Sequence, residues 1–191
     1  MNIQSRYPTT PDEFLRWNEG REGKREFVRG QVEELMINVT RNHAEIALNF
    51  AAELRARLDR KLFSLGSADF GVRTPEGIRY PDAYVDRRTS SSRGTDLAAS
   101  QPVLVAEVLS PSSYGRDFVD KLADYEGIGS LQHYVILSHE EPRAWFWSRT
   151  ADGTWPKKPQ EIAGDEEAIE LAGLGISIPM AELYAGIECR P

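Results

Sequence analysis

One short segment, Val103 to Leu109, constrains the fold of this chain more than any other. It is apolar at both odd and even positions except at Glu107. A run of this length and pattern is typical of a central strand that is covered on both faces. We therefore expect Glu107 to be buried, and burying an unpaired carboxylate costs several kcal/mol unless it is protonated, paired or bound to a metal. The rest of the sequence must supply that compensation.

The segment that follows offers a cation. We expect a turn through residues 110–113 and then a helix to about Tyr125 or Glu126, with Lys121 about 60° from the centre of its apolar stripe. Glu107 lies ~10 Å before the end of its strand and Lys121 ~12 Å into the returning helix, so their side chains can lie at one level. The stripe itself consists of Tyr114, Phe118, Leu122 and Tyr125.

A second interpretation pairs Lys121 with a residue of its own helix. Asp117 precedes it by four residues. An exposed pair of this kind contributes only ~0.3 to 0.5 kcal/mol to a helix. In that case Lys121 would lie on a solvated face and take no part in a site.

A second carboxylate follows a proline in Tyr80-Pro81-Asp82. Taken alone, Asp82 is a simple turn residue. Magnesium, however, takes oxygen ligands, keeps several waters and needs only one or two protein carboxylates beside a substrate phosphate. Asp82 and Glu107 would be sufficient for such a site.

These segments together resemble the Uma-two-type restriction endonuclease family of the PD-(D/E)XK nuclease superfamily. The resemblance covers about residues 10 to 138. It implies an α/β fold with a restriction-endonuclease-like core: a central mixed β-sheet flanked by helices, with an N-terminal helix and hairpin and additional C-terminal strands. It rests on Arg25 to Gly30, on His43 with Ile46 and Leu54, on Tyr80-Pro81-Asp82, on Ala106 to Ser112, and on Asp117 through Lys121 to Tyr125.

The chain departs from the superfamily pattern at one important position. The second acid and the lysine usually lie two residues apart on one strand, but Leu109 occupies the expected lysine position. The resemblance assigns the lysine role to Lys121. This agrees with the distances given above, which place the side chains of Glu107 and Lys121 at one level. The next strand carries His133 and Ser138 where the family tends to have acidic residues, so no ligands are expected from it.

The expected catalytic residues are therefore Asp82, Glu107 and Lys121. Asp82, Glu107 and the backbone carbonyl of Val108 would hold Mg²⁺ (or Mn²⁺), which activates water and neutralises charge on a phosphodiester. Lys121 would position the water or stabilise the phosphate. Three further residues are candidates for an auxiliary role: Glu26, His43 and Asp117.

Hydrophobic periodicity and turn residues predict the remaining elements. Three lie before residue 62: a helix from Pro11 to about Asn18, a hairpin from Arg25 to Ile37 that turns at Arg29-Gly30, and a long helix from Thr40 to about Lys61. Later strands are expected at residues 68–73, 79–86, 133–137 and 142–149, with a mobile loop at 87–101, weaker strands after Trp155 and a helical turn at 179–184.

Length and composition set broader limits. With 191 residues, we expect a single domain spanning 1–191. The sequence has no stretch of ~18 to 20 apolar residues and no signal-peptide pattern, so we expect a cytoplasmic protein without a membrane partner. Cys189 is the only cysteine, which excludes an internal disulfide and a cysteine-rich zinc site. Apolar surface at residues 145–147 and on the C-terminal strands would favour a homodimer or higher homo-oligomer.

The expected function is that of a metal-dependent endonuclease that hydrolyses phosphodiester bonds of nucleic acid, with DNA as the first candidate. The net charge of −7 argues against extensive phosphate contacts unless lysines and arginines gather on one surface. The alternative is a catalytically silent nuclease fold that acts as a regulatory or assembly binding module.

Overall fold

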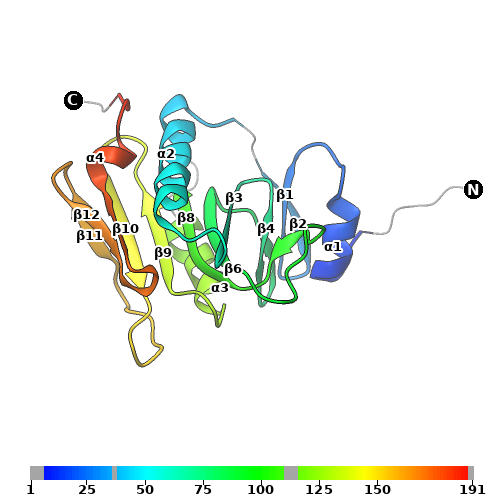
Figure 1. Ribbon diagram of the computed structural model, residues 1–191. Helices are drawn as coiled ribbons and strands as arrows, with labels where there is room; N and C mark the ends of the chain where they lie inside the picture. Colours follow the sequence, from blue (N-terminus) through cyan, green and yellow to red (C-terminus); the bar gives the residue numbers. More distant parts are fainter. Residues whose placement is uncertain (1–6, 36–37, 110–115, 189–191) are drawn as a thin grey trace, which may run out of the picture.

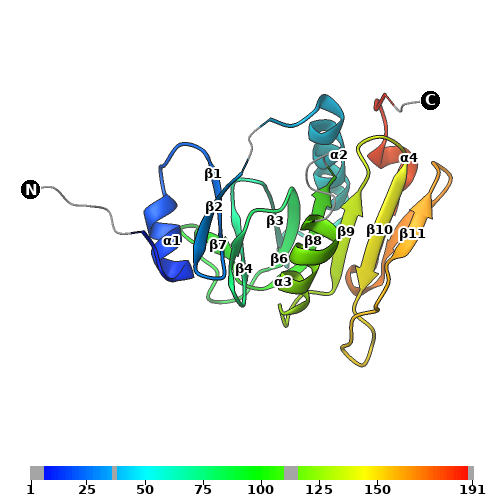
Figure 2. The same ribbon diagram turned by 180° about the vertical axis from the view of Figure 1, so that it is seen from behind.

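The computed structural model describes residues 7–35, 38–109 and 116–188, and the side chains of these residues apart from 116 and 117. The strands form two mixed β-sheets and a C-terminal hairpin, and helices lie against them (Figures 1 and 2). The smaller sheet lies toward the N-terminal end and the larger sheet toward the C-terminal end. The predicted α/β class is confirmed.

The larger sheet has six strands in the order β11-β10-β9-β8-β6-β3. Only β8 and β9 pair in parallel, and the other neighbours pair antiparallel. Every residue of β8 and of β9 is buried, as the apolar run around Glu107 predicts. The six strands are β3 (Phe63–Ser67), β6 (Ala83–Arg87), β8 (Pro102–Val108), β9 (His133–Leu137), β10 (Arg143–Ser148) and β11 (Gln160–Ala163).

Helices cover both faces of this sheet. In Figure 1, α2 (Arg41–Arg57) lies in front of the strands, and α3 (Leu122–Glu126) lies behind them and comes forward in Figure 2. Ile46, Phe50 and Leu54 recur every four residues along α2 and are fully buried. The helix ends at Arg57, four residues before the predicted Lys61, because Leu58 is already extended.

The smaller sheet has five strands in the order β2-β1-β5-β4-β7. The predicted hairpin is present, and its turn residues Arg29 and Gly30 both have positive φ, as a type I′ turn requires. Helix α1 (Pro11–Asn18) begins at Thr10, whose side chain accepts a hydrogen bond from the Glu13 N–H. The five strands are β1 (Lys24–Val28), β2 (Gln31–Leu35), β4 (Gly71–Thr74), β5 (Gly77–Arg79) and β7 (Ala98–Ala99).

The strands predicted at 68–73 and 79–86 are wrong in their boundaries. The first is replaced by β3 and β4, with a turn between them. The second is broken at residues 80–82, where the chain leaves β5 in the smaller sheet and enters β6 in the larger one. Pro81 has no N–H to give to a ladder, so a continuous strand is unfavourable there. The segment 87–101, predicted as a loop, contains the short strand β7.

The C-terminal part adds β12 (Ala168–Leu171), a 3₁₀ turn (Ala172–Leu174), β13 (Ile176–Pro179) and α4 (Met180–Leu183). Met180 and Leu183 pack into the same core as α2. Phe146 and Trp147 are buried, and the large apolar side chains exposed on the described residues lie elsewhere: Tyr7, Val39, Leu48, Leu62 and Val119. The apolar surface invoked for oligomerisation is therefore not at residues 145–147, and the homo-oligomer stays a prediction. Among the described helices, none has the length and apolar character needed to cross a membrane.

Candidate active site

Asp82 and Glu107 meet where β6 begins and β8 ends. The two strands are antiparallel with Ala83 opposite Ala106, and Asp82 lies one step before that pair. Its Oδ2 accepts a hydrogen bond of 2.8 Å from the Val108 N–H. Glu107 faces α3, whose Lys121 and Tyr125 contact it, and Asp82 lies at the strand end against Val108, the residue after Glu107. The two predicted carboxylates are brought together.

Glu107 is buried and has two partners on the helix that follows. The Nζ of Lys121 lies 2.8 Å from Oε2 of Glu107, and the Tyr125 hydroxyl donates to Oε1 at 2.9 Å. Lys121 is itself only 8% exposed, so it does not lie on a solvated helix face. The side chain of Asp117, its other predicted partner and an auxiliary candidate, lies outside the described residues.

The local helix geometry places Lys121. Residues Arg116–Lys121 form a π-helical turn, which passes directly into α3. Single π turns inside helices are uncommon and frequently lie at functional sites. Lys121 and Tyr125 are four residues apart, so they share one face of the helix and reach the same carboxylate. The sequence pattern predicted the helix but not its π turn.

His43, an auxiliary candidate, contacts Asp82 directly. Its Nε2 lies 3.2 Å from Oδ1 of Asp82, and His43 is mostly buried in the first turn of α2. Burial raises the pKa of Asp82, but the hydrogen bond and charge of His43, the Val108 N–H and the charge of Lys121 outweigh it and leave the pKa lowered. Asp82 is therefore held as a carboxylate.

Glu26, another auxiliary candidate, belongs to a second buried charge cluster beside the first. Its Oε2 lies 2.7 Å from Nη1 of Arg79, and its Oε1 accepts from the Tyr80 N–H at 3.0 Å. Arg79 also donates from Nε to Asp124 Oδ2 at 3.0 Å. All three charged residues are nearly inaccessible to solvent.

Lys121 links the two clusters. Burial raises the pKa of Glu26, yet the charges of Lys121 and Arg79 and its hydrogen bonds leave it lowered. The charge of Lys121 also lowers the pKa of Asp82. One ammonium group thus acts on Glu26, Asp82 and Glu107. Sequence reasoning missed Arg79, Asp124 and Tyr125, although Tyr125 was expected on the apolar stripe.

The donor set is compatible with a hard cation. Asp82 and Glu107 offer carboxylate oxygens, and the carbonyl of Val108 points to the same side as its N–H, toward Asp82, because both groups of a strand residue face one neighbour. The described residues contain no group of three or more His, Cys, Asp or Glu side chains that could hold an ion. A metal would therefore depend on these two carboxylates together with backbone, water or substrate oxygens.

Comparisons with known proteins agree with this architecture. The model of the Uma2 family, described as "Putative restriction endonuclease", matches residues 11–181. Two uncharacterized proteins of Synechocystis sp. are 26% and 25% identical, over 93% and 87% of this chain and 92% and 94% of their own lengths. A crystal structure of "a putative nuclease belonging to DUF820" from Anabaena variabilis has a TM-score of 0.73 at 14% identity, covering 93% of this chain and 98% of that one. The predicted nuclease fold is confirmed.

Proposed function

Because the chain belongs to the Uma2 restriction endonuclease family, we propose that it is a metal-dependent endonuclease that hydrolyses phosphodiester bonds of DNA. The observation that supports this most is the buried pair of Glu107 and Lys121 beside Asp82. A lysine and two carboxylates that converge at one end of a sheet are the groups that such a reaction needs.

In the proposed mechanism, Asp82, Glu107 and the Val108 carbonyl would hold Mg²⁺ or Mn²⁺. The ion would supply Lewis acidity and lower the pKa of the attacking water. Tyr125 keeps the Glu107 carboxylate oriented through Oε1, while Oε2 faces the Lys121 ammonium. Asp82 is oriented from its other side by His43.

Lys121 has a flexible stem and one compact charge. While it pairs with Glu107, it neutralises a buried carboxylate. If Glu107 held the metal ion, the Lys121 ammonium would be able to turn toward the substrate. It would then orient the attacking water and stabilise the charge that develops on the phosphate. Arg79 holds Glu26 in place, so that Glu26 adds negative potential near Lys121.

The test is cleavage of DNA and RNA substrates with Mg²⁺, Mn²⁺ or EDTA. We expect metal-dependent cleavage of DNA that falls at least about 100-fold in Glu107→Gln and in Lys121→Met. Glu166→Gln and Lys157→Met change the same residue types at exposed positions after β10 and serve as controls. Equal activity in all variants would remove the assignment.

The alternative, a nuclease fold that binds without cleaving, has one observation in its favour. Both carboxylates of the site already have nitrogen neighbours, Lys121 Nζ and His43 Nε2, and the net charge of the chain is −7. In that case the wild type would bind a partner, with no cleavage under any metal condition, and Glu107→Gln would leave that binding unchanged.

A further inference from the structure

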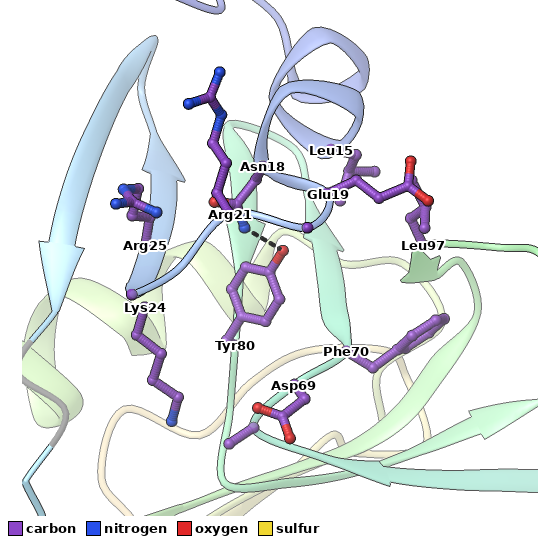
Figure 3. A pocket seen from close by; sticks show the side chains of 13 residues that line it. Leu15, Asn18, Glu19, Arg21, Lys24, Arg25, Asp69, Phe70, Tyr80 and Leu97 are labelled. Carbon is purple, nitrogen blue, oxygen red and sulfur yellow. Dashed lines mark hydrogen bonds between the residues drawn. The ribbon is translucent and has the colours of Figure 1, made fainter.

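A pocket of about 310 Å³ lies at the end of α1 (Figure 3). Its walls come from α1, from the turn that leads into β1, from the β3–β4 turn and from Tyr80. The volume is at the lower end of the range of small-ligand sites. The pocket is therefore large enough for one nucleotide-sized group.

The pocket is lined by charges of both signs. In Figure 3, Arg21, Lys24 and Arg25 lie on one side of the Tyr80 ring, and Phe70 lies on the other. Two carboxylates also line the pocket: in Figure 3, Glu19 lies on the far side near Leu97, and Asp69 lies below Tyr80, toward Lys24. Three cations and two carboxylates therefore line the pocket, a small local excess of positive charge in a chain of net charge −7.

Two polar atoms among the lining residues are buried without a hydrogen-bond partner in the described structure: Oδ1 of Asn18 and Nη1 of Arg25. Buried polar groups are almost always satisfied, so such atoms need an explanation. Nδ2 of Asn18 contacts the Tyr80 hydroxyl at 3.5 Å, and turning the amide over would only exchange which group lacks a partner. Both atoms have almost no exposed surface, so they lie inside the pocket wall, out of reach of a ligand, and Nε of Arg25 contacts Oε1 of Glu34 at 3.3 Å.

The cationic side is built by the local backbone. The guanidinium of Arg21 lies 4.3 Å from the centre of the Trp17 ring, and its Nε donates to the Trp17 carbonyl. Gly23 has φ of +91°, and a Cβ there would lie 3.3 Å from Nη2 of Arg25. The turn therefore favours a glycine at position 23 for its backbone angle.

The pocket is joined to the candidate site through two short connections. Tyr80 lies two residues before Asp82, and its N–H donates to Glu26. Lys24 and Glu26 lie two positions apart on β1, on one face and about 6.8 Å apart along the strand. Tyr80 therefore joins the pocket wall to the segment that carries Asp82.

We propose that this pocket binds one nucleotide of the nucleic-acid substrate that flanks the cleaved bond. The inference rests on the proposed function for its choice of ligand. Arg21 and Lys24 contact the phosphate, the Asn18 amide nitrogen hydrogen-bonds to the edge of the base, and the base stacks against the Tyr80 or Phe70 ring. Asn18 makes the pocket a determinant of base preference.

The test is binding of a short fluorescein-labelled DNA strand to the full chain in EDTA, measured by fluorescence anisotropy over a salt series. Each phosphate contact contributes about 0.7 to the slope of log affinity against log salt for single strands. We expect Arg21→Ala and Lys24→Ala each to weaken binding, and the loss of this one phosphate contact to lower the slope by at most about this amount. Lys157→Ala, the matched control, should bind as the wild type does.

Base recognition has a separate readout. Tyr80→Leu should weaken binding about 5-fold to 100-fold, as the loss of one stacked base does. Asn18→Ala should change the relative affinity for strands of different base composition while leaving the salt slope unchanged. Thermal unfolding of each variant shows whether it folds as the wild type does.

Two outcomes separate this inference from the proposed function. If Arg21→Ala and Lys24→Ala bind and cleave like the wild type, the pocket assignment is overturned while the nuclease assignment stands. If the wild type binds DNA through these residues but never cleaves it, the pocket is supported and the nuclease assignment fails.

Discussion

Lys121 and Glu107 form a buried ion pair, with Nζ and Oε2 2.8 Å apart, although one residue lies on a helix and the other on a strand. The superfamily arrangement that the sequence resembles would have put the lysine at Leu109. In this chain, the π-helical turn brings an ammonium group back over the end of β8 instead. The same groups are therefore assembled from different backbone positions.

The pair should dominate the stability of this region. Glu107→Gln or Lys121→Met alone leaves one buried charge without its partner, and such changes destabilise by about 3 to 5 kcal/mol. The double variant removes both charges and should recover most of that loss. Urea unfolding of the four proteins measures the coupling, and a double variant as unstable as the sum of the two singles would contradict it.

Acid should destabilise the protein through Asp82 and Glu26. Both have pKa values lowered from their ordinary 3.8 and 4.5, because neighbouring cations and hydrogen bonds outweigh the effect of burial. Their stabilisation is present above those ordinary values and is lost as the pH falls through the lowered ones. Urea unfolding of Arg79→Met over this acidic range should show a weaker pH dependence than the wild type. An unchanged dependence would contradict the role of Arg79.

His133 should give a second pH dependence at milder acidity. Burial lowers its pKa from 6.5 to about 4, so the folded protein holds it neutral where an unfolded chain would protonate it. Stability should be highest above pH 6.5 and decline as the pH falls toward 4. Chemical unfolding of His133→Leu should lack this decline. If wild type and variant show parallel profiles over this window, another group is responsible.

Gly77 should be intolerant of any side chain. A Cβ at this position would lie 1.7 Å from the Phe27 carbonyl oxygen, because β5 packs tightly against β1. Gly77→Ala should destabilise the fold by about 3 kcal/mol through strain. Gly94→Ala is the control, since a Cβ at Gly94 has no neighbour within 4 Å. Comparable melting temperatures for the two variants would show that the sheet can shift to make room.

Local patterns in the sequence predicted the parts of the fold that depend on local chemistry. The apolar run around Glu107 gave a buried central strand, and the helical period gave Lys121 on the face toward it. Capping by Thr10 and Thr40 set the starts of α1 and α2. The catalytic roles of these residues stay predictions.

What the sequence did not reveal depends on pairing between distant segments. Arg79 meets Glu26 only because β5 pairs with β1, with Ile78 opposite Phe27. It meets Asp124 only because α3 packs over the same place. Glu26 and Asp124 both lie too far from Arg79 in the sequence for hydrophobic periodicity to relate them. The second charge cluster is therefore visible only in the three-dimensional structure.

Residues 80–82 connect the two sheets, and this connection has a consequence for the order of events in folding. The side chains of the site come from positions as far apart as Glu26 and Tyr125, and they meet only when both sheets have formed and docked. Contacts of such high sequence separation form late and slowly during folding. After dilution from denaturant, secondary structure should therefore return before the environment around Lys121 does. A chain still emerging from the ribosome at Tyr80 would not yet possess the site.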